Sequence, residues 1–261
     1  MERIPFDRIA DSYDDTRAYP DVVMNDVLRV MEGELPEQGL ILDAGIGTGR
    51  FASPLQARGY RVIGIDIADR MIGKAREKGT ENILKGDVCF MPFRDETFDT
   101  TISVHVLHLI ADWLCALKEI TRVTKTDFLS VTSNKEKSPA QEVRRAYEHL
   151  CGELGHPVCP PGLRERELQE LLRPDLVRKI CVYVHSIDVQ QMIDGMDSRL
   201  LSVQWSVPDE IHVNAIEALR REFEGMVQLP EVERISLVAW RIDRLGKFAS
   251  SPDRPGLTLH Q

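Results

Sequence analysis

The stretch that most constrains this chain is residues 40–51, which read Leu-Ile-Leu-Asp-Ala-Gly-Ile-Gly-Thr-Gly-Arg-Phe. An apolar run ends in the carboxylate of Asp43, and Gly45, Gly47 and Gly49 follow at alternate positions. This order is typical of a parallel strand that turns sharply into a helix, because glycine adopts backbone angles that other residues avoid and lets a ligand approach the main chain. We therefore expect Asp43 at the carboxyl end of a strand, where open α/β sheets bind their ligands.

The spacing of these glycines distinguishes two kinds of cofactor. A dinucleotide-binding turn has the pattern Gly-x-Gly-x-x-Gly and directs a helix N-terminus at a pyrophosphate. This chain instead has Asp-x-Gly-x-Gly-x-Gly. Asp43 would repel a pyrophosphate, but it would attract a cationic group such as an amino-acid ammonium or a sulfonium. A glycine turn that only connects a strand to a helix is the alternative.

Two further apolar runs also end in an acid. Residues 61–66 end in Asp66, and residues 82–87 end in Asp87. A carboxylate about 20 residues after a glycine turn can accept hydrogen bonds from both hydroxyls of a ribose. One such aspartate could be a helix cap. Three strands ending in aspartate, with a glycine turn at the first, indicate a ligand-binding edge.

Together these segments resemble a class I S-adenosylmethionine-dependent methyltransferase of the type 11, or ubiquinone/menaquinone-methyltransferase-like, family. The resemblance covers about residues 40–131, half of the chain, and residues 6–17 resemble the flap helix that precedes the core in this family. It rests on the glycine turn and on four further segments: Gly64-Ile-Asp-Ile67 with Met71, Gly86-Asp-Val88, Met91-Pro-Phe…Phe98-Asp99 and Ser103-Val-His-Val-Leu-His108.

The resemblance implies S-adenosyl-L-methionine as the cofactor. The residues that it implies for cofactor binding are Tyr13, Arg17, Asp43, Ala44, Gly45, Gly47, Gly49, Asp66, Ile67, Met71, Asp87, Val88 and Ser103. Asp43 and Gly45 would lie beside the methionine moiety, and Asp66 would bind the ribose. Ile67 and Met71 would flank the adenine, while Asp87 and Val88 would meet its edge.

Tyr13 and Arg17 share a helix face because they lie four residues apart. They would close over the cofactor, with Arg17 pairing its carboxylate. The alternative is a surface helix in which Arg17 pairs with Asp14 or Asp21.

The catalytic candidates are His105 and His108, which follow the fourth expected strand. A histidine near the methyl group could deprotonate an oxygen, nitrogen or sulfur nucleophile, since its pKa lies near neutrality. Both lie in an apolar stretch, so a buried, hydrogen-bonded histidine is an equal alternative for His108. Arg199 and Trp205 are the substrate-binding candidates, because their segment resembles one that some type 11 members place over the substrate pocket. The alternatives are a surface arginine and a packing tryptophan.

Alternating strands and helices predict an α/β fold, a Rossmann-like and mostly parallel sheet with helices on both faces. The resemblance adds a seventh, antiparallel strand. The expected strands are 39–43, 61–66, 82–85, 99–104, 127–132, 177–187 and 235–242, and Pro54 should kink a helix over 48–58. We expect a cofactor-binding core with an N-terminal flap helix in 1–132, a helical lid insertion in 133–175, the rest of the core with further substrate-pocket elements in 176–248, and a disordered tail in 249–261.

Composition argues against several other classes. The net charge of −9, without a basic run, argues against a nucleic-acid surface. No apolar stretch reaches the roughly 18–20 residues of a membrane span, and the first residues lack the apolar core of a signal peptide. The five cysteines contain no Cys-x-x-Cys pair, which favours free thiols in a reducing cytoplasm. No spacing matches a common metal site.

We therefore predict a cytoplasmic S-adenosylmethionine-dependent methyltransferase, a monomer or homodimer, that acts on an oxygen, nitrogen or sulfur atom of a small molecule. Methyl transfer from a sulfonium mainly needs alignment of the reacting atoms and exclusion of water, without a metal. One alternative is a nicotinamide-dependent oxidoreductase on a Rossmann sheet. Another is a non-catalytic module that binds S-adenosylmethionine.

Overall fold

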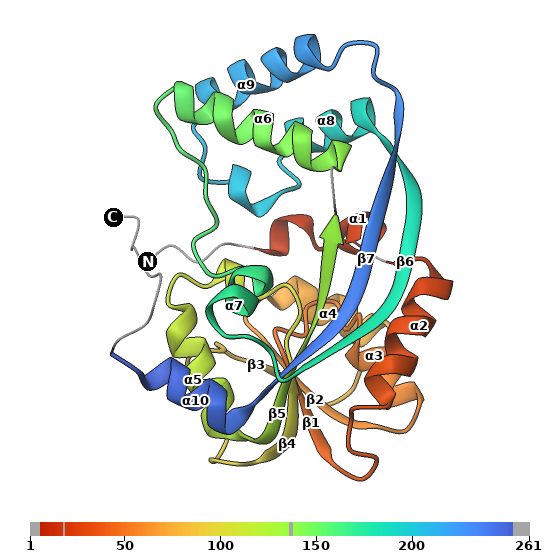
Figure 1. The fold of residues 1–261 in the computed structure, drawn as a ribbon, viewed down its shortest axis with the longest axis vertical. Coiled ribbons are helices and arrows are strands. Elements are labelled where there is room, and N and C mark those ends of the chain that lie inside the picture. Colours follow the sequence, from red (N-terminus) through yellow and green to blue (C-terminus); the bar gives the residue numbers. More distant parts are fainter. Residues whose placement is uncertain (1–5, 18, 136–137, 253–261) are drawn as a thin grey trace. The chain divides into compact units, whose positions relative to one another are not determined.

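The computed structural model describes residues 6–17, 19–135 and 138–252. In this part of the chain, seven strands form one sheet in the order β3-β2-β1-β4-β5-β7-β6 (Figure 1). They are β1 (Leu40–Ala44), β2 (Arg61–Asp66), β3 (Ile83–Lys85), β4 (Phe98–Ile102), β5 (Thr124–Lys135), β6 (Leu176–Asp188) and β7 (Gln228–Arg241). Strands β1 to β5 pair in parallel and the last strands run antiparallel, which confirms the predicted fold class.

Helices connect these strands. The α-helices are α1 (Tyr13–Arg17), α2 (Asp21–Glu32), α3 (Ala52–Ala57), α4 (Asp69–Glu77), α5 (Trp113–Val123), α6 (Pro139–Glu153), α7 (Glu165–Leu171), α8 (Val189–Asp197), α9 (Asp209–Glu222) and α10 (Ile242–Ser250). Short 3-10 helices are η1 (Phe6–Ile9), η2 (Leu107–Leu109) and η3 (Ser202–Gln204). No helix in the described residues is long and apolar enough to cross a bilayer.

The helix after the glycine turn is shorter than the sequence predicts. Helix α3 begins at Ala52, so Pro54 lies in its first turn. Amide nitrogens in a first turn have no partner within the helix, and a proline there therefore removes no helical hydrogen bond. The predicted start of this helix at residue 48 is therefore wrong, and the reason for expecting a kink at Pro54 does not apply.

The described residues divide into two compact units. The first, which we call the core unit, comprises residues of Pro5–Thr132, Pro161–Ile180 and Ser236–Gln261. The second, which we call the helical unit, comprises Ser133–Pro160 and Cys181–Ile235. Of the segment 133–175 that we expect as a lid insertion, residues 133–160 therefore group with the helical unit and residues 161–175 with the core unit.

The C-terminal part of the core unit is ordered further than we expect from the sequence. Ala249 and Ser250, placed in the predicted disordered tail, are the last residues of α10. The reason is that Leu245 and Ala249 are fully buried in the same apolar cluster as Ile120 of α5. The tail residues 253–261 lie outside the described residues.

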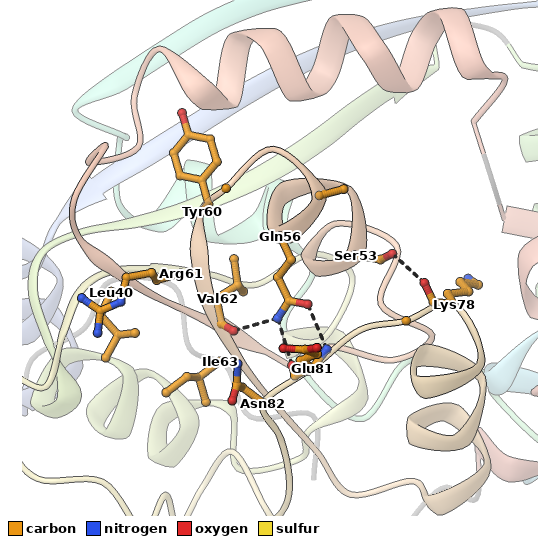
Figure 2. Close-up of a pocket in the computed structure, with 13 residues that line it drawn as sticks. Leu40, Ser53, Gln56, Tyr60, Arg61, Val62, Ile63, Lys78, Glu81 and Asn82 are labelled. Carbon is orange, nitrogen blue, oxygen red and sulfur yellow. Dashed lines mark hydrogen bonds between the residues drawn. The ribbon is translucent and has the colours of Figure 1, made fainter.

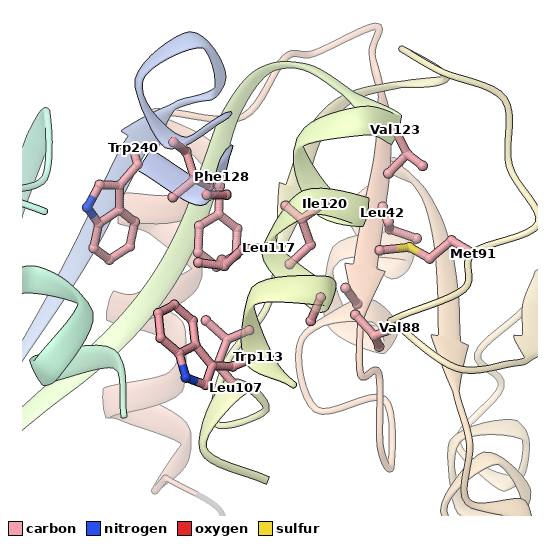
Figure 3. Packing of buried hydrophobic residues seen from close by; sticks show 14 of the residues in the cluster. Leu42, Val88, Met91, Leu107, Trp113, Leu117, Ile120, Val123, Phe128 and Trp240 are labelled. Atoms are coloured by element: carbon pink, nitrogen blue, oxygen red, sulfur yellow. The ribbon is translucent and has the colours of Figure 1, made fainter. Parts of the chain in front are cut away.

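The apolar core of the core unit packs α5 against the sheet (Figure 3). Helix α5 begins after Asp112, whose carboxylate accepts the backbone N–H of Cys115 at 3.1 Å. Its buried residues recur at helical spacing, and they are Trp113, Ala116, Leu117, Ile120 and Val123.

Phe128 of β5 stacks on Trp240 of β7 with ring centroids 5.6 Å apart. The Trp240 indole N–H donates to the carbonyl of Leu172 at 2.7 Å, so this ring is both packed and hydrogen-bonded.

Strand register brings the predicted site residues to one edge of the sheet. Asp43 lies opposite Gly64 of β2 and opposite Ile102 of β4. Asp66 lies opposite Lys85 of β3. Because all of these strands are parallel, their carboxyl ends share one edge, and the segments that follow β1, β2 and β4 meet there.

Candidate functional site

The glycine turn after β1 has the left-handed backbone that its sequence predicts. The φ angles of Gly45, Gly47 and Gly49 are 82°, 55° and 75°, respectively. A Cβ atom on Gly45 would lie 2.4 Å from the Cγ2 atom of Val106, so the turn and the segment after β4 are in direct contact. Any side chain here would be strained and would displace that segment.

Asp66 ties the glycine turn to the end of β2. Its carboxylate accepts the backbone N–H of Gly47 at 2.7 Å and that of Ala68 at 2.9 Å. Burial raises the pKa of Asp66, and these backbone donors oppose the shift. The carboxylate predicted to bind a ribose therefore also holds the conformation of the turn.

Asp43 is the more deeply buried of the two carboxyl groups. Its side chain is 3% exposed. Burial, and secondarily the charge of Asp66, raises its pKa to about 7, against the opposing effects of the Ala52 N–H and of Arg50. A cation bound beside Asp43 would favour its ionised form, as expected for a site that takes a positively charged ligand.

A small cavity of about 30 Å³ adjoins the turn. It is lined by Tyr13, Asp43, Gly45, Ile46, Thr48, Arg50, Phe51, Val104 and His105. Four residues predicted from sequence, Tyr13, Asp43, Gly45 and His105, thus come together from α1, β1, the glycine turn and the segment after β4. Sequence reasoning missed Thr48 and Arg50. The available signal was their position within and directly after the glycine turn.

Hydrogen bonds connect helix α1 to the glycine turn and to Arg50 directly after it. The hydroxyl of Thr48 donates to the carboxylate of Asp14 at 2.7 Å, and Lys78 forms an ion pair with the same carboxylate. Arg50 donates to the backbone carbonyl of Arg17 at 2.8 Å. Burial raises the pKa of Tyr13 and lowers that of Arg17, so both residues lie in a largely desolvated environment.

The residues predicted around the adenine lie in different environments. Met71 of α4 packs in a small apolar cluster with Ala10 and Ala68. Ile67 is 37% exposed. Val88 is buried in the main apolar core, so a cofactor would meet its backbone rather than its side chain. Asp87 accepts the backbone N–H of Cys89 at 2.9 Å.

Ser103 joins the two central strands. Its hydroxyl donates to the carbonyl of Ala44 at 2.7 Å, and both residues are buried. This bond fixes the end of β4 against the end of β1, which supports the edge where the site lies.

The two histidines follow β4 and have different surroundings. His105 lines the small cavity and has a left-handed backbone, with a φ of 60°. The His105 and His108 ring centroids are 6.5 Å apart. Burial, aided by the charges of Arg17 and Arg164, lowers the pKa of His108 to about 4. His108 is therefore neutral at pH 7.

A carboxylate distant in sequence supports the His105 backbone. Glu165, at the start of α7, is 8% exposed and accepts the backbone N–H of His105 at 2.7 Å. Burial raises the pKa of Glu165, while its backbone donors, including Val106, oppose the shift. Sixty residues separate the partners, so no local pattern in the sequence pointed to this contact.

Arg199 and Trp205 belong to the helical unit. The Arg199 guanidinium donates to the carbonyls of Gln204 and Val207 and to the carboxylate of Asp209, and the Trp205 indole donates to the carbonyl of Arg199. These contacts hold together the segment between α8 and α9. A substrate-binding role for Arg199 and Trp205 stays a prediction.

A larger cavity, of about 580 Å³, opens elsewhere on the core unit (Figure 2). Its lining includes Leu40 and Arg61, the first residues of β1 and β2, and so it lies at the amino ends of these strands. Within this lining, the Gln56 side-chain amide donates to the carbonyls of Val62 and Glu81 (Figure 2). It contains no residue of the predicted site, and parallel sheets bind ligands at the opposite edge. The small cavity beside the glycine turn is therefore the candidate site.

In the described part of the chain, no group of three or more histidine, cysteine, aspartate or glutamate side chains is placed to hold a metal ion.

Comparison with known proteins agrees with this geometry. A family model described as a methyltransferase domain, of type 11, matches residues 42–128. A malonyl-[acyl-carrier protein] O-methyltransferase from Serratia marcescens is 33% identical over 149 residues, which are 57% of this chain and 58% of that protein. The protein of that name from Erwinia pyrifoliae is 32% identical over 124 residues, 47% of each chain. A phosphatidylethanolamine N-methyltransferase from Cereibacter sphaeroides is 29% identical over 127 residues, 45% of this chain and 62% of that protein. The chain thus spans about half the length of these relatives.

Solved structures share the fold at low sequence identity. An S-adenosylmethionine-dependent methyltransferase from Thermotoga maritima has a TM-score of 0.50 at 21% identity and covers 92% of this chain and 99% of its own. The YcgJ protein from Bacillus subtilis has a TM-score of 0.52 at 19% identity and covers 85% of this chain and 98% of its own.

The fold and the glycine turn define a Rossmann-like α/β protein, and its candidate ligand edge lies at the carboxyl ends of β1, β2 and β4. Within that class, residues 42–128 match the model of the type 11 methyltransferase domain, which confirms the predicted resemblance to the S-adenosylmethionine-dependent methyltransferases of that type.

Proposed function

We propose that this protein is an S-adenosylmethionine-dependent methyltransferase that transfers a methyl group to an oxygen, nitrogen or sulfur atom of a small molecule. The observation that carries the proposal is the meeting of Asp43, the glycine turn and His105 around one cavity, beside Asp66. The sulfonium cofactor, when bound, supplies the activated methyl group. The protein's task is then to orient the acceptor and to exclude water.

The charged residues of the site fit this cofactor. Asp43 is buried and Asp66 is half-buried, and desolvation raises the pKa of each carboxyl group. A nearby positive charge would stabilise their ionised forms. The cofactor carries an ammonium and a sulfonium, whereas a dinucleotide would bring a pyrophosphate toward the same carboxylates. This contrast favours the methyltransferase over a nicotinamide-dependent oxidoreductase.

We assign a binding or catalytic role to each residue of the candidate site. Asp43 holds the ammonium, and Asp66 accepts hydrogen bonds from the ribose while keeping the turn in place through Gly47. Tyr13 and Arg17 of α1 cover the site from outside. His105 removes a proton from an acceptor atom that carries one, because His105 lines the same cavity as Asp43.

The names of the relatives favour one class of acceptor group. Proteins named malonyl-[acyl-carrier protein] O-methyltransferase support a carboxylate oxygen, on a small molecule or on a carrier. We further propose that the protein is cytoplasmic and is a monomer or homodimer. Its net charge of −9 argues against a nucleic-acid partner.

The test is formation of S-adenosylhomocysteine by the purified protein in the presence of S-adenosylmethionine and a panel of acceptors. The panel contains malonyl thioesters, other carboxylic acids, phenols, amines and thiols. With an accepted phenol, amine or thiol, whose acceptor atom can carry a proton at neutral pH, His105→Ala should lower turnover by about 100-fold or more, the usual range for a general base. A carboxylate acceptor is already ionised and needs no base, so turnover of a carboxylate should change less. His105→Ala should change cofactor affinity little.

His149→Ala is the matched control, because His149 is a 74% exposed histidine on α6. Unaltered turnover in His105→Ala would remove His105 as the base. Binding of the cofactor with no product from any acceptor would favour the alternative of a non-catalytic binding module.

A further inference from the structure

Arg50, the residue directly after the glycine turn, has buried hydrogen-bond donors without partners. Its Nε and Nη2 atoms are both buried, and neither has a hydrogen-bond partner among the described residues. Its Nη1 atom donates to the carbonyl of Arg17 at 2.8 Å. Buried charged donors are costly to leave unsatisfied, so a ligand that completes them is the expected explanation.

The unpartnered atoms form one edge of the guanidinium group. Nε and Nη2 point in the same direction, and this is the edge that binds a carboxylate through two parallel hydrogen bonds. Nη1, on the other side, is already occupied by the Arg17 carbonyl. Arg50 therefore presents a single free bidentate edge.

Two aromatic rings hold this group in place. The Arg50 Cζ atom lies 4.6 Å from the centroid of the Tyr19 ring and 4.8 Å from that of the Phe51 ring. Cation–π contacts on the guanidinium, together with the Nη1 hydrogen bond, restrict its rotation. A preorganised edge of this kind loses little conformational entropy when it binds.

Arg50 and Asp43 line the same cavity with opposite charges. Arg50 lowers the pKa of Asp43, yet it forms no ion pair with any carboxylate within the described ranges 6–17, 19–135 and 138–252. The residues that line the cavity thus include an acceptor for an ammonium, Asp43, and an arginine whose bidentate edge has no partner and can bind a carboxylate. An α-amino acid carries this pair of groups.

We infer that Arg50 binds the carboxylate of the cofactor's amino-acid moiety through Nε and Nη2, beside the cavity that Asp43 also lines. This inference rests on the proposed function. It assigns recognition of the carboxylate to a residue outside the set predicted from sequence, in which Arg17 had that role. Arg50 is a binding and positioning residue, because holding the amino-acid end fixes where the sulfur lies.

The inference is tested by comparing two ligands that differ at this group. S-adenosylhomocysteine carries the amino-acid moiety, whereas 5′-methylthioadenosine has the same adenosine and thioether without it. Calorimetric titrations of both ligands are made with the wild type, Arg50→Met, Arg50→Lys and Arg58→Met. Arg58 is the control, because its nitrogens contact Pro54, Asn25 and Glu32.

Arg50→Met should weaken S-adenosylhomocysteine binding by about 10- to 100-fold, the range that hydrogen bonds to a charged group contribute. Its affinity for 5′-methylthioadenosine should stay within about twofold of the wild type. Arg50→Lys should recover part of the loss, since a lysine keeps the charge without the bidentate edge. Arg58→Met should bind both ligands like the wild type.

An equal loss for both ligands in Arg50→Met would assign Arg50 a structural role and overturn the inference. Unchanged S-adenosylhomocysteine affinity in Arg50→Met would also overturn it, while leaving the proposed function intact. A folded wild type that binds neither ligand would overturn the proposed function itself.

Discussion

Replacing Asp43 by asparagine should stabilise the ligand-free protein above neutral pH. Burial and the neighbouring Asp66 raise the pKa of Asp43 from 3.8 to about 7. A carboxyl group whose pKa is higher in the folded state takes up a proton on folding, so stability decreases as the pH rises between these two values. An asparagine stays neutral throughout, and its carbonyl oxygen can still accept the N–H of Ala52.

The expected size follows from the two pKa values. The interval from 3.8 to about 7 corresponds to a penalty of about 4 kcal/mol. The penalty is absent below about pH 4, grows up to about pH 7 and is complete above it. Between pH 5 and pH 8, the difference in unfolding free energy between Asp43→Asn and the wild type should therefore increase by about 2 to 3 kcal/mol.

Urea denaturation at pH 5 and pH 8, followed by circular dichroism, measures this difference. Asp69→Asn is the control for loss of one negative charge, since the Asp69 side chain is 65% exposed beside Lys85. A difference between Asp43→Asn and the wild type that is the same at both pH values would refute the reasoning.

Four further outcomes are expected. S-adenosylhomocysteine affinity should fall as the pH drops below about 7, because an ammonium binds the ionised form of Asp43, whose pKa is about 7. Calorimetry at pH 5.5 and pH 8 measures this change, and equal affinities at the two pH values would contradict it. Asp66→Ala should weaken that binding by about 1–3 kcal/mol, the scale of lost hydrogen bonds to buried polar groups; unchanged affinity would refute the ribose role. Gly162→Ala should destabilise the protein by about 1–3 kcal/mol, because its Cβ would lie 2.1 Å from the Leu107 carbonyl oxygen. Gly152→Ala, in α6 with open space around it, should instead stabilise it by up to about 1 kcal/mol, and urea denaturation separates the two.

The sequence predicts the cofactor-side strands closely because their signals are local. The apolar run 61–66 gives the bounds of β2 as observed, and the expected strand 39–43 differs from β1 by one residue at each end. Buried parallel strands are nearly continuous apolar segments, so their bounds follow from composition. The glycine turn is equally local, since its positive φ angles need glycine whatever else the chain does.

The last strand is longer than its sequence suggests. We expect a strand over 235–242, but β7 begins at Gln228 and contains Glu231 and Glu233, both buried. Burying two carboxylates requires partners. Lys135 lies 3.2 Å from Glu231 and 3.4 Å from Glu233. The positive charge that pairs with these two glutamates therefore comes from β5, about a hundred residues earlier in the chain. The residue pattern within β7 alone does not indicate this partner.

The same limit applies to the site. Asp43, Tyr13 and His105 were recognisable because a motif or a family resemblance marks them. The role inferred for Arg50 depends on its tertiary surroundings: Tyr19 and Phe51 flank its guanidinium, and two of its buried donors have no hydrogen-bond partner. Tertiary packing creates such roles, and a single sequence does not display them.

Calorimetric titration of the full chain with S-adenosylhomocysteine, with NAD titrated in parallel, tests the central claim most directly. We predict saturable micromolar binding of S-adenosylhomocysteine and no measurable binding of NAD. Binding of NAD alone, or of neither ligand to folded protein, would contradict the assignment of this sheet edge to S-adenosylmethionine.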